Sequence, residues 1–254
     1  MINPFTVGQP VPPERFVGRE NEIAIAFDQI LTRSNLALWG GSGIGKTSFL
    51  ELLASREIWQ LQGYDPSNAI IVYLNCLGIY PFVASTFWRE ILKLIKEQLE
   101  TEVFYRSNID TLIAKAEVTK DDVGQILKKI GEANQFLLLL LDDYDATLRP
   151  HPKYTENDIK NFLSECRNLA YHSQERRYLS VIVTSSRRLT EISPNLTPEN
   201  SPWYNHYLFQ PLKPFTDNEA AILLAGMPMT PSMRDGIREI AGGHPALLQN
   251  AGFL

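Results

Sequence analysis

The sequence lacks the features that mark extracellular and membrane proteins. It holds two cysteines, at positions 76 and 166, and so offers no framework for disulfide bonds or a metal site. Its longest purely apolar run, Phe136 to Leu141, is too short to span a bilayer and is typical of a buried strand. The N-terminus has no basic segment followed by an apolar core, so no signal peptide is predicted. These absences favour a cytoplasmic protein that does not contact a membrane.

The sequence also lacks an excess of positive charge. It has 24 Lys and Arg against 29 Asp and Glu, a formal net charge of −5, which argues against non-specific nucleic-acid binding. A hydrophobic content of 44% with 21% charged residues is ordinary for a globular protein. Its 254 residues can form one large α/β domain, or a domain with a small appendage.

The eight residues from Gly40 to Thr47, GGSGIGKT, fit the phosphate-loop pattern G-x-x-x-x-G-K-[ST] at every position. The pattern is informative where a strand precedes it and a helix follows it. Residues 35–39 form an apolar run of strand length, and residues 46–54 carry apolar side chains at helical spacing. The sequence therefore predicts a nucleotide site, and an ordinary Gly/Ser-rich turn is the disfavoured alternative.

The residue types of this loop explain how it would bind a nucleotide. Its glycines let successive backbone N–H groups point inward, and the following helix adds the positive end of its dipole. We expect Lys46 on the β- and γ-phosphates, Thr47 on Mg²⁺ and Ser48 near the α-phosphate. The other residues of the loop expected to contact the nucleotide are Gly41, Ser42, Gly43, Ile44 and Gly45.

Strand-like and helical segments alternate up to about residue 213. After the strand at 35–39, near-continuous apolar strands are predicted at 69–74, 136–141, 179–184 and 206–212. Helices are expected at about 21–32, 84–102, 119–131 and 155–171, with a poorly defined segment after 102 and a polar loop at about 194–205. This alternation predicts an α/β fold with a five-stranded parallel sheet flanked by helices.

Beyond residue 213 we expect helices only. A capping box begins the first at Thr216, a Thr-Pro pair begins the second at Thr230, and the third starts near Pro245. We therefore expect an extended N-terminal arm at 1–14, an α/β core at 15–213 and the start of a helical lid at 214–254.

Acidic residues follow the apolar strand at 136–141. We expect Asp142 to hold Mg²⁺ through water and Asp143 to orient or deprotonate an attacking water. Acids at strand ends are mostly solvated in proteins at large, but the phosphate loop upstream favours the catalytic interpretation. Asp145 is interpreted as a turn residue.

Several motifs occur in an order that resembles STAND-type P-loop ATPases, signal-transduction ATPases related to AAA+ proteins and to NB-ARC domains. The resemblance covers residues 14 to about 250, and the order of the motifs carries it more than any one of them. The motifs are FVGRE at 16–20, the phosphate loop, the strand with Asp142 and Asp143, SSR at 185–187, LKPF at 212–215 before Glu219, and GHP at 243–245.

The resemblance implies roles for residues outside the phosphate loop. Backbone groups around Phe16, Val17 and Gly18 would hold adenine, with Arg19 nearby. Pro245 would pack on the nucleotide from the lid. The family's sheet order is 5-1-4-3-2.

The resemblance also implies a sensor of the γ-phosphate at Arg187, since a guanidinium suits phosphate geometry. The polar stretch at 184–188 is longer than the family's usual pattern, so Arg188 competes for this role. The family normally continues into a winged-helix domain and then sensor or effector domains. We therefore expect this chain to be a module of a longer protein, with those partners outside it.

The resulting prediction is an ATP-binding, slowly hydrolysing switch domain that uses ATP or ADP and Mg²⁺. In this hypothesis ADP holds the lid closed, and ATP permits opening and self-association into a homo-oligomer. Two alternatives stay open. One is a DNA-associated AAA+ ATPase related to origin-recognition or transposition-helper proteins, against which the net charge weighs. The other is a non-hydrolysing scaffold in which bound ADP is structural.

Overall fold

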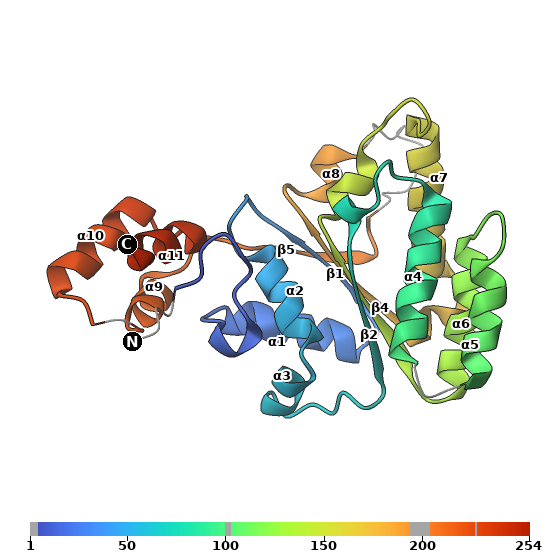
Figure 1. Cartoon of the computed structure of the whole chain (residues 1–254), viewed down its shortest axis with the longest axis horizontal. Helices are drawn as coiled ribbons and strands as arrows, with labels where there is room; N and C mark the ends of the chain where they lie inside the picture. The colour runs from blue at the N-terminus through green and yellow to red at the C-terminus, as the bar shows by residue number, and fades with distance from the viewer. Residues whose placement is uncertain (1–4, 100–102, 194–203, 227) are drawn as a thin grey trace.

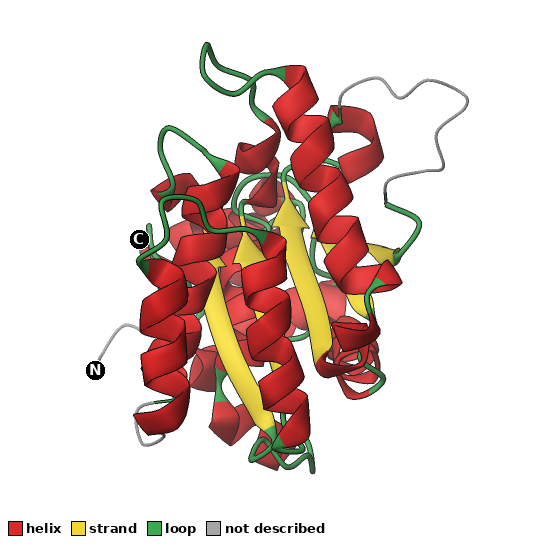
Figure 2. Ribbon diagram, turned by 90° about the vertical axis from the view of Figure 1, so that its right-hand side faces the viewer, coloured by secondary structure: helices red, strands yellow, loops and turns green. Residues whose placement is uncertain are grey.

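The computed structural model describes residues 5–99, 103–193, 204–226 and 228–254 and shows a five-stranded parallel sheet between layers of helices (Figures 1 and 2). The strands are β1 (Asn35–Trp39), β2 (Ala69–Asn75), β3 (Phe136–Asp142), β4 (Leu179–Ser185) and β5 (Tyr207–Pro211). Their spatial order is β2-β3-β4-β1-β5 and all the pairs are parallel. Counted from the other edge this is 5-1-4-3-2, so the predicted fold class and strand order are confirmed.

The helices fall into three groups (Figure 1). One face of the sheet is covered by α1 (Glu20–Leu31), α2 (Lys46–Ala54) and α3 (Arg56–Leu61). The other side holds α4 (Ala84–Gln98), α5 (Val103–Ile113), α6 (Lys120–Glu132) and α7 (Glu156–Arg167), while the short α8 (Leu189–Ile192) follows β4. The C-terminal group is α9 (Asp217–Leu224), α10 (Pro231–Ala241) and α11 (Pro245–Phe253). Across the described ranges, no helix combines the length and the apolar character that crossing a bilayer requires.

The alternation of side chains along the strands separates two hydrophobic cores. In β3, Leu137, Leu139 and Leu141 belong to the core under α4–α7, whereas Leu138 and Leu140 belong to the core under α1–α3. Because successive side chains of a strand point to opposite faces, position 142 falls on the α1–α3 side, beside α2. The hydrophobic pattern of β3 thereby directs a carboxylate toward the helix that follows the phosphate loop.

The C-terminal helices have a small core of their own, which includes a residue from the start of the chain. Ala220, Leu224, Ala241 and Leu248 are buried together with Phe5. The Phe5 ring fills the space beside Gly252, where an added Cβ would lie 2.5 Å from Phe5 Cζ. The N-terminal arm, described from residue 5, is therefore packed into the helices expected to form the lid. The first four residues of the predicted arm lie outside the described residues.

Some predicted boundaries were wrong, and local contacts explain the differences. The helix expected to reach residue 102 ends at Gln98, and residues 100–102 lie outside the described ranges. The segment interpreted as poorly defined contains α5, and the helix expected to reach 171 is α-helical only to Arg167 and continues as a π-helical turn over Asn168–His172. An additional helix, α3, begins where the Ser55 side chain accepts a hydrogen bond from the Ile58 N–H. Most of the predicted polar loop at 194–205 lies outside the described residues.

We predict that the turn between α10 and α11 tolerates no side chain at Gly243. Its φ is 77°, and an added Cβ would lie 2.4 Å from the carbonyl oxygen of Phe215. Left-handed strain and a collision with backbone should together destabilise Gly243→Ala by roughly 2 kcal/mol or more. Chemical denaturation followed by circular dichroism measures this loss.

The neighbouring Gly242→Ala is the matched control. Gly242 has a φ of 55° with nothing near the position of an added Cβ, so only the left-handed conformation costs free energy, about 1 kcal/mol. Equal stabilities for the two variants would contradict the packing of Gly243 against Phe215.

Candidate functional site

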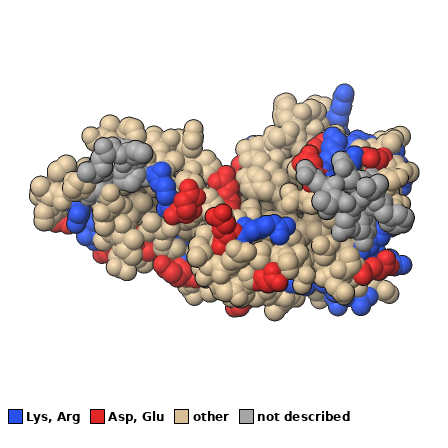
Figure 3. Space-filling view, turned by 60° about the horizontal axis from the view of Figure 1, so that its bottom comes forward, with Lys and Arg blue, Asp and Glu red and all other residues tan. Residues whose placement is uncertain are grey.

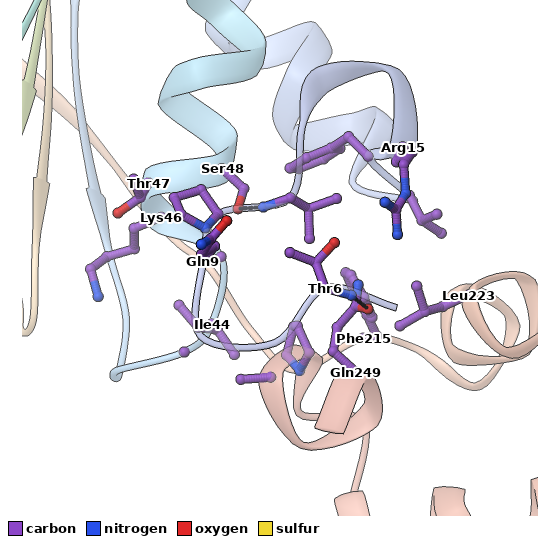
Figure 4. A pocket seen from close by; sticks show the side chains of 18 of the residues that line it. Thr6, Gln9, Arg15, Ile44, Lys46, Thr47, Ser48, Phe215, Leu223 and Gln249 are labelled. Carbon is purple, nitrogen blue, oxygen red and sulfur yellow. Dashed lines mark hydrogen bonds between the residues drawn. The ribbon is translucent and has the colours of Figure 1, made fainter. Parts of the chain in front are cut away.

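A cavity of about 510 Å³ lies between the phosphate loop, the N-terminal arm and the C-terminal helices (Figure 4). Lys46 and Thr47 lie at one end of the view in Figure 4, and Phe215, Leu223 and Gln249 lie at the other. The end with Lys46 is therefore polar, while the opposite end combines the apolar Phe215 and Leu223 with the polar Gln249. Phe16 and Val17 also line the cavity.

The phosphate loop presents unpaired backbone N–H groups to this cavity. Gly43, Ile44 and Gly45 all line it, and their amide nitrogens donate no hydrogen bond to the described part of the chain. The loop leads directly into α2, whose first-turn N–H groups and dipole favour an anion. These are the features that the predicted anion site requires, and anion binding by this loop stays a prediction.

Lys46 folds back onto its own loop. Its Nζ donates to the carbonyl oxygens of Gly40 at 2.9 Å and Gly41 at 3.0 Å. These acceptors are neutral, and an anionic phosphate oxygen would be a stronger partner for the ammonium. The side chain is thus held next to the loop amides, within the lining of the cavity.

The carboxylate of Asp142 is fully buried and accepts three hydroxyl groups. Thr47 Oγ1 and Tyr73 Oη donate to Oδ2 at 2.8 and 2.9 Å, and Thr184 Oγ1 donates to Oδ1 at 2.5 Å. These donors come from α2, β2 and β4, so the hydrogen bonds that make burial of the charge tolerable also tie the loop helix to the sheet. Burial and the nearby Asp142 raise the pKa of Tyr73, which therefore stays a hydroxyl donor at neutral pH.

Asp143 turns away from the sheet and lines the cavity. Its backbone is left-handed, with a φ of 48°, and its N–H donates to Thr184 Oγ1 at 3.0 Å. Burial raises the pKa of Asp143, and the carboxylates of Asp142 and Asp145 raise it further, while Lys46 opposes them. The side chain is consequently a better proton acceptor than an ordinary aspartate.

Arg19, expected near adenine, connects the phosphate loop to the C-terminal helices. It is 3% exposed, and its Nη2 donates to the carbonyl oxygens of Ile44 and Lys213, both at 2.9 Å. Its backbone N–H donates to Glu219 Oε1 at 2.7 Å. Burial lowers the pKa of Arg19, and Glu22 and Glu219 act against this shift. The residue lines the cavity, but its guanidinium is already used by two backbone carbonyls.

The start of α11 packs directly on the phosphate loop. The amide of Ala246 donates to Gly43 O at 3.2 Å, and His244 Nε2 lies 3.0 Å from Ser42 O. Gly43 permits this approach because an added Cβ would lie 2.8 Å from the Ala246 Cβ. Pro245, the first residue of α11, is buried and lines the cavity, and its contact with a nucleotide stays a prediction.

The two arginines considered as sensors lie outside the cavity lining. Arg187 is exposed, and the guanidinium of Arg188 lies 4.8 Å from the centre of the Phe209 ring. Asp145, interpreted from the sequence as a turn residue, also lies outside the lining. Its carboxylate accepts a hydrogen bond from Ser186 Oγ at 2.8 Å. The structure therefore does not bring either arginine to the loop, and the sensor role stays a prediction.

The predicted adenine contacts are brought together only in part. Phe16 and Val17 line the cavity. Gly18 does not, because it lies against the lid, where an added Cβ would be 2.5 Å from Glu219 Oε1. Gly41, the second residue of the phosphate loop, is exposed and also lies outside the lining.

The N-terminal arm crosses the cavity between two attachments. The Thr6 N–H donates to Gln249 Oε1 at 2.9 Å, and the Val11 N–H donates to Ser48 Oγ at 2.9 Å. Ser48, predicted near the α-phosphate, thus has its oxygen occupied as an acceptor while its hydroxyl hydrogen stays available. The arm forms one wall of the cavity and connects α11 to α2 (Figure 4).

Sequence reasoning missed Tyr73, Thr184, Thr6 and Gln249. The sequence could have predicted the first two. Side chains alternate along a strand, so Tyr73 and Thr184 lie on the same face of the sheet as Asp142 once β2 and β4 are placed beside β3. No local signal existed for the contact of Thr6 with Gln249, which joins the two ends of the chain.

No protein-family model matches the chain, and no curated protein sequence is similar to it. Solved structures are similar in fold. The chain resembles the Walker-type ATPase PABY2304 of Pyrococcus abyssi with a TM-score of 0.67 and 16% identity, over 98% of this chain and 70% of that one. It resembles the Aeropyrum pernix ORC2 protein in its ADPNP–ADP complexes with a TM-score of 0.59 and 16% identity, over 92% and 59% of the two chains.

A third similar structure is Drosophila ORC bound to DNA, with a TM-score of 0.54, 15% identity and coverage of 94% of this chain and 55% of that one. The chain thus spans little more than half the length of the two ORC proteins. Because the sequence identities are this low, the similarity to these structures establishes the architecture alone. The activity has to be argued from the residues of the site. The fold of this chain is that of the P-loop ATPases of the AAA+ type.

Proposed function

We propose that this chain is an ATP-binding and ATP-hydrolysing switch domain of the STAND type. One observation carries the proposal: the free amides of the phosphate loop, Lys46 and Thr47 line one end of a single cavity, and Thr47 is hydrogen-bonded to the buried Asp142 behind it. The apolar opposite end suits a base, and the packing of α11 on the loop suits a lid. The division into an arm at 1–14, a core at 15–213 and a lid at 214–254 belongs to this proposal.

The residues present fit a Mg²⁺ ion. The Thr47 hydroxyl and the Asp142 carboxylate are hard oxygen donors, 2.8 Å apart at Oγ1 and Oδ2. No cluster of three or more His, Cys, Asp or Glu able to hold a metal occurs in the described ranges, and Mg²⁺ with a nucleotide needs none, since phosphate and water fill its other positions. Bound there, the ion would neutralise charge on the phosphates. Thr47 would hold it, and Asp142 would do so through water.

Asp143 is the residue of this site suited to accept a proton. It lines the cavity beside Lys46, and its raised pKa gives it more basicity than an aspartate in water. In the proposal it orients the attacking water and takes its proton, while Lys46 and the loop amides stabilise charge on the phosphoryl group. Arg187 is proposed as the sensor of the γ-phosphate after a rearrangement of its loop.

The switch would act through the lid. Arg19, His244 and Ala246 connect the phosphate loop to the C-terminal helices by hydrogen bonds to loop carbonyls. A ligand that moves these carbonyls changes the contacts that hold the lid, which is what a two-state switch requires. We propose that ADP favours this packed arrangement and that ATP favours an open one competent for self-association.

We predict that Lys46→Ala abolishes binding of Mg-ATP. The variant removes the cation that would contact the β- and γ-phosphates, and such a charged hydrogen bond supports most of the affinity at this kind of loop. Isothermal titration calorimetry and the rise in melting temperature with Mg-ATP measure the loss. The exposed Lys93, paired with Glu90 on α4, supplies the control Lys93→Ala, which should bind as the unaltered chain does. Undiminished binding by Lys46→Ala would refute the proposed site.

We predict that Asp143→Asn binds ATP and stops hydrolysis, with turnover falling about 100-fold or more. In the unaltered chain, hydrolysis should decline as the pH falls through the raised pKa of Asp143, because only the ionised carboxylate accepts a proton. Phosphate release across a pH series measures both effects. Asp145→Asn, a matched change outside the cavity lining, should keep most of the turnover.

The same pKa shift fixes the sign of the effect on stability. A carboxyl whose pKa is raised by folding disfavours the folded state above its ordinary pKa, and this penalty disappears as the pH falls below that value. Asp143→Asn should therefore be no less stable than the unaltered chain at neutral pH. A large loss of stability there would mean that the carboxylate supports the fold rather than the reaction.

A DNA-associated ATPase is the second candidate, favoured by the similarity to an ORC structure solved with DNA. On the face shown in Figure 3, Lys and Arg side chains gather toward the right-hand end, with Asp and Glu among them. Because the formal net charge is −5, we predict no measurable binding of a fluorescent duplex at about 200 mM salt and only weak binding at about 50 mM. Tight binding that weakens steeply between these concentrations would favour the DNA-associated function.

A further inference from the structure

Gln249 is a buried amide at the apolar end of the cavity. It lies on α11 one turn after Pro245, is 7% exposed, and is part of the cavity lining. Figure 4 shows it beside Thr6, at the end of the cavity opposite Lys46. A polar side chain buried to this extent normally has its hydrogen-bonding groups satisfied.

The arm determines which way the Gln249 amide faces. A backbone N–H can only donate, so the contact with the Thr6 N–H at 2.9 Å identifies the partner atom as Oε1. The Nε2 group is then the other end of the amide, and the hydrogen bond to Thr6 is the one that the Gln249 side chain makes with the described residues. Gln249 thus offers the cavity a donor and has its acceptor already occupied.

The surroundings of Gln249 suit a flat aromatic ring with a polar edge. Phe215 and Leu223 lie at the same end of the cavity, together with Arg15 (Figure 4), and apolar walls with a few placed polar groups are typical of sites for planar ligands. Ser48, beside the phosphate loop, is oriented in the same way as Gln249. Its oxygen accepts a hydrogen bond from the Val11 N–H, so its hydroxyl group can donate to a ligand. Two N–H groups of one arm therefore orient two side chains of the cavity as donors.

We infer that Gln249 determines base specificity by donating a hydrogen bond from Nε2 to an acceptor atom on the edge of the nucleobase, and that the N-terminal arm positions it through Thr6. The inference rests on the proposed function, since it names the base-reading residue of the same site. A ring nitrogen of adenine is the acceptor for the proposed ligand. The base is therefore recognised jointly by the last helix, α11, and the N-terminal arm, not by the phosphate loop.

The test compares ATP with inorganic tripolyphosphate, which has no base. Gln249→Met keeps the length of the side chain and removes the donor, so ATP should bind roughly tenfold more weakly while tripolyphosphate binding is unchanged. Gln60→Met, the same change at an exposed position on α3, is the control and should alter neither. Competition against a fluorescent nucleotide in the presence of Mg²⁺ measures all the affinities.

A second variant separates base reading from anchoring of the arm. Gln249→Glu retains an oxygen for the Thr6 N–H but has no donor when ionised, so it should lose ATP affinity as Gln249→Met does. Thr6→Pro removes the N–H that orients the amide and should reduce the preference for ATP over tripolyphosphate. Full recovery of ATP binding in Gln249→Glu would overturn the inference, because a purely anchoring role would then explain the loss in Gln249→Met.

Three ATP analogues locate the acceptor atom. One of 1-deaza-ATP, 3-deaza-ATP and 7-deaza-ATP, each lacking one ring nitrogen, should bind the unaltered chain about as weakly as ATP binds Gln249→Met, and should lose nothing further in that variant. Normal ATP binding by Gln249→Met with intact tripolyphosphate binding would overturn the inference alone. Failure of the unaltered chain to bind tripolyphosphate would overturn the proposed function and this inference with it.

Discussion

The buried carboxylate of Asp142 is the interaction on which the site depends. A fully buried charge is tolerated only with strong partners, and here hydroxyl groups from α2, β2 and β4 supply them. The same hydrogen bonds hold Thr47 at the end of β3 and so fix the position of the loop helix over the sheet. The hydrogen bonds of Asp142 therefore both position Thr47 in the site and hold α2 against the sheet.

The cavity exists because parts of the chain that are distant in sequence meet over the phosphate loop. The loop supplies the polar end, the arm supplies a wall, and the C-terminal helices supply the closing side. Arg19 is buried where these parts meet, with its guanidinium on the carbonyls of Ile44 and Lys213. A charged group in that position favours one geometry of loop and lid, since another would remove the two carbonyl acceptors of its guanidinium.

Pattern and period in the sequence were sufficient to predict the strands and the phosphate loop, because each depends on residues close together in the chain. The strand order depends on pairs that are distant in sequence, and it was predicted only through the resemblance to STAND-type ATPases. The position of Asp142 followed from the same periodicity. The role of Arg19 and the course of the arm could not be predicted in this way. A buried guanidinium and a solvated one look alike in sequence, and the contact between Thr6 and Gln249 depends on how the completed fold brings the two ends together.

The strand order also has a consequence for synthesis of the chain on the ribosome. β1, which leads into the phosphate loop, pairs with β4 on one side and β5 on the other, and Leu36 lies opposite Ile182. Residues 35–39 are thus translated long before either neighbouring strand, whereas β2 and β3 can pair with each other earlier. An unfinished polypeptide consequently lacks both strands that pair with β1, and the strand that leads into GGSGIGKT gains its first neighbour only when translation has passed β4.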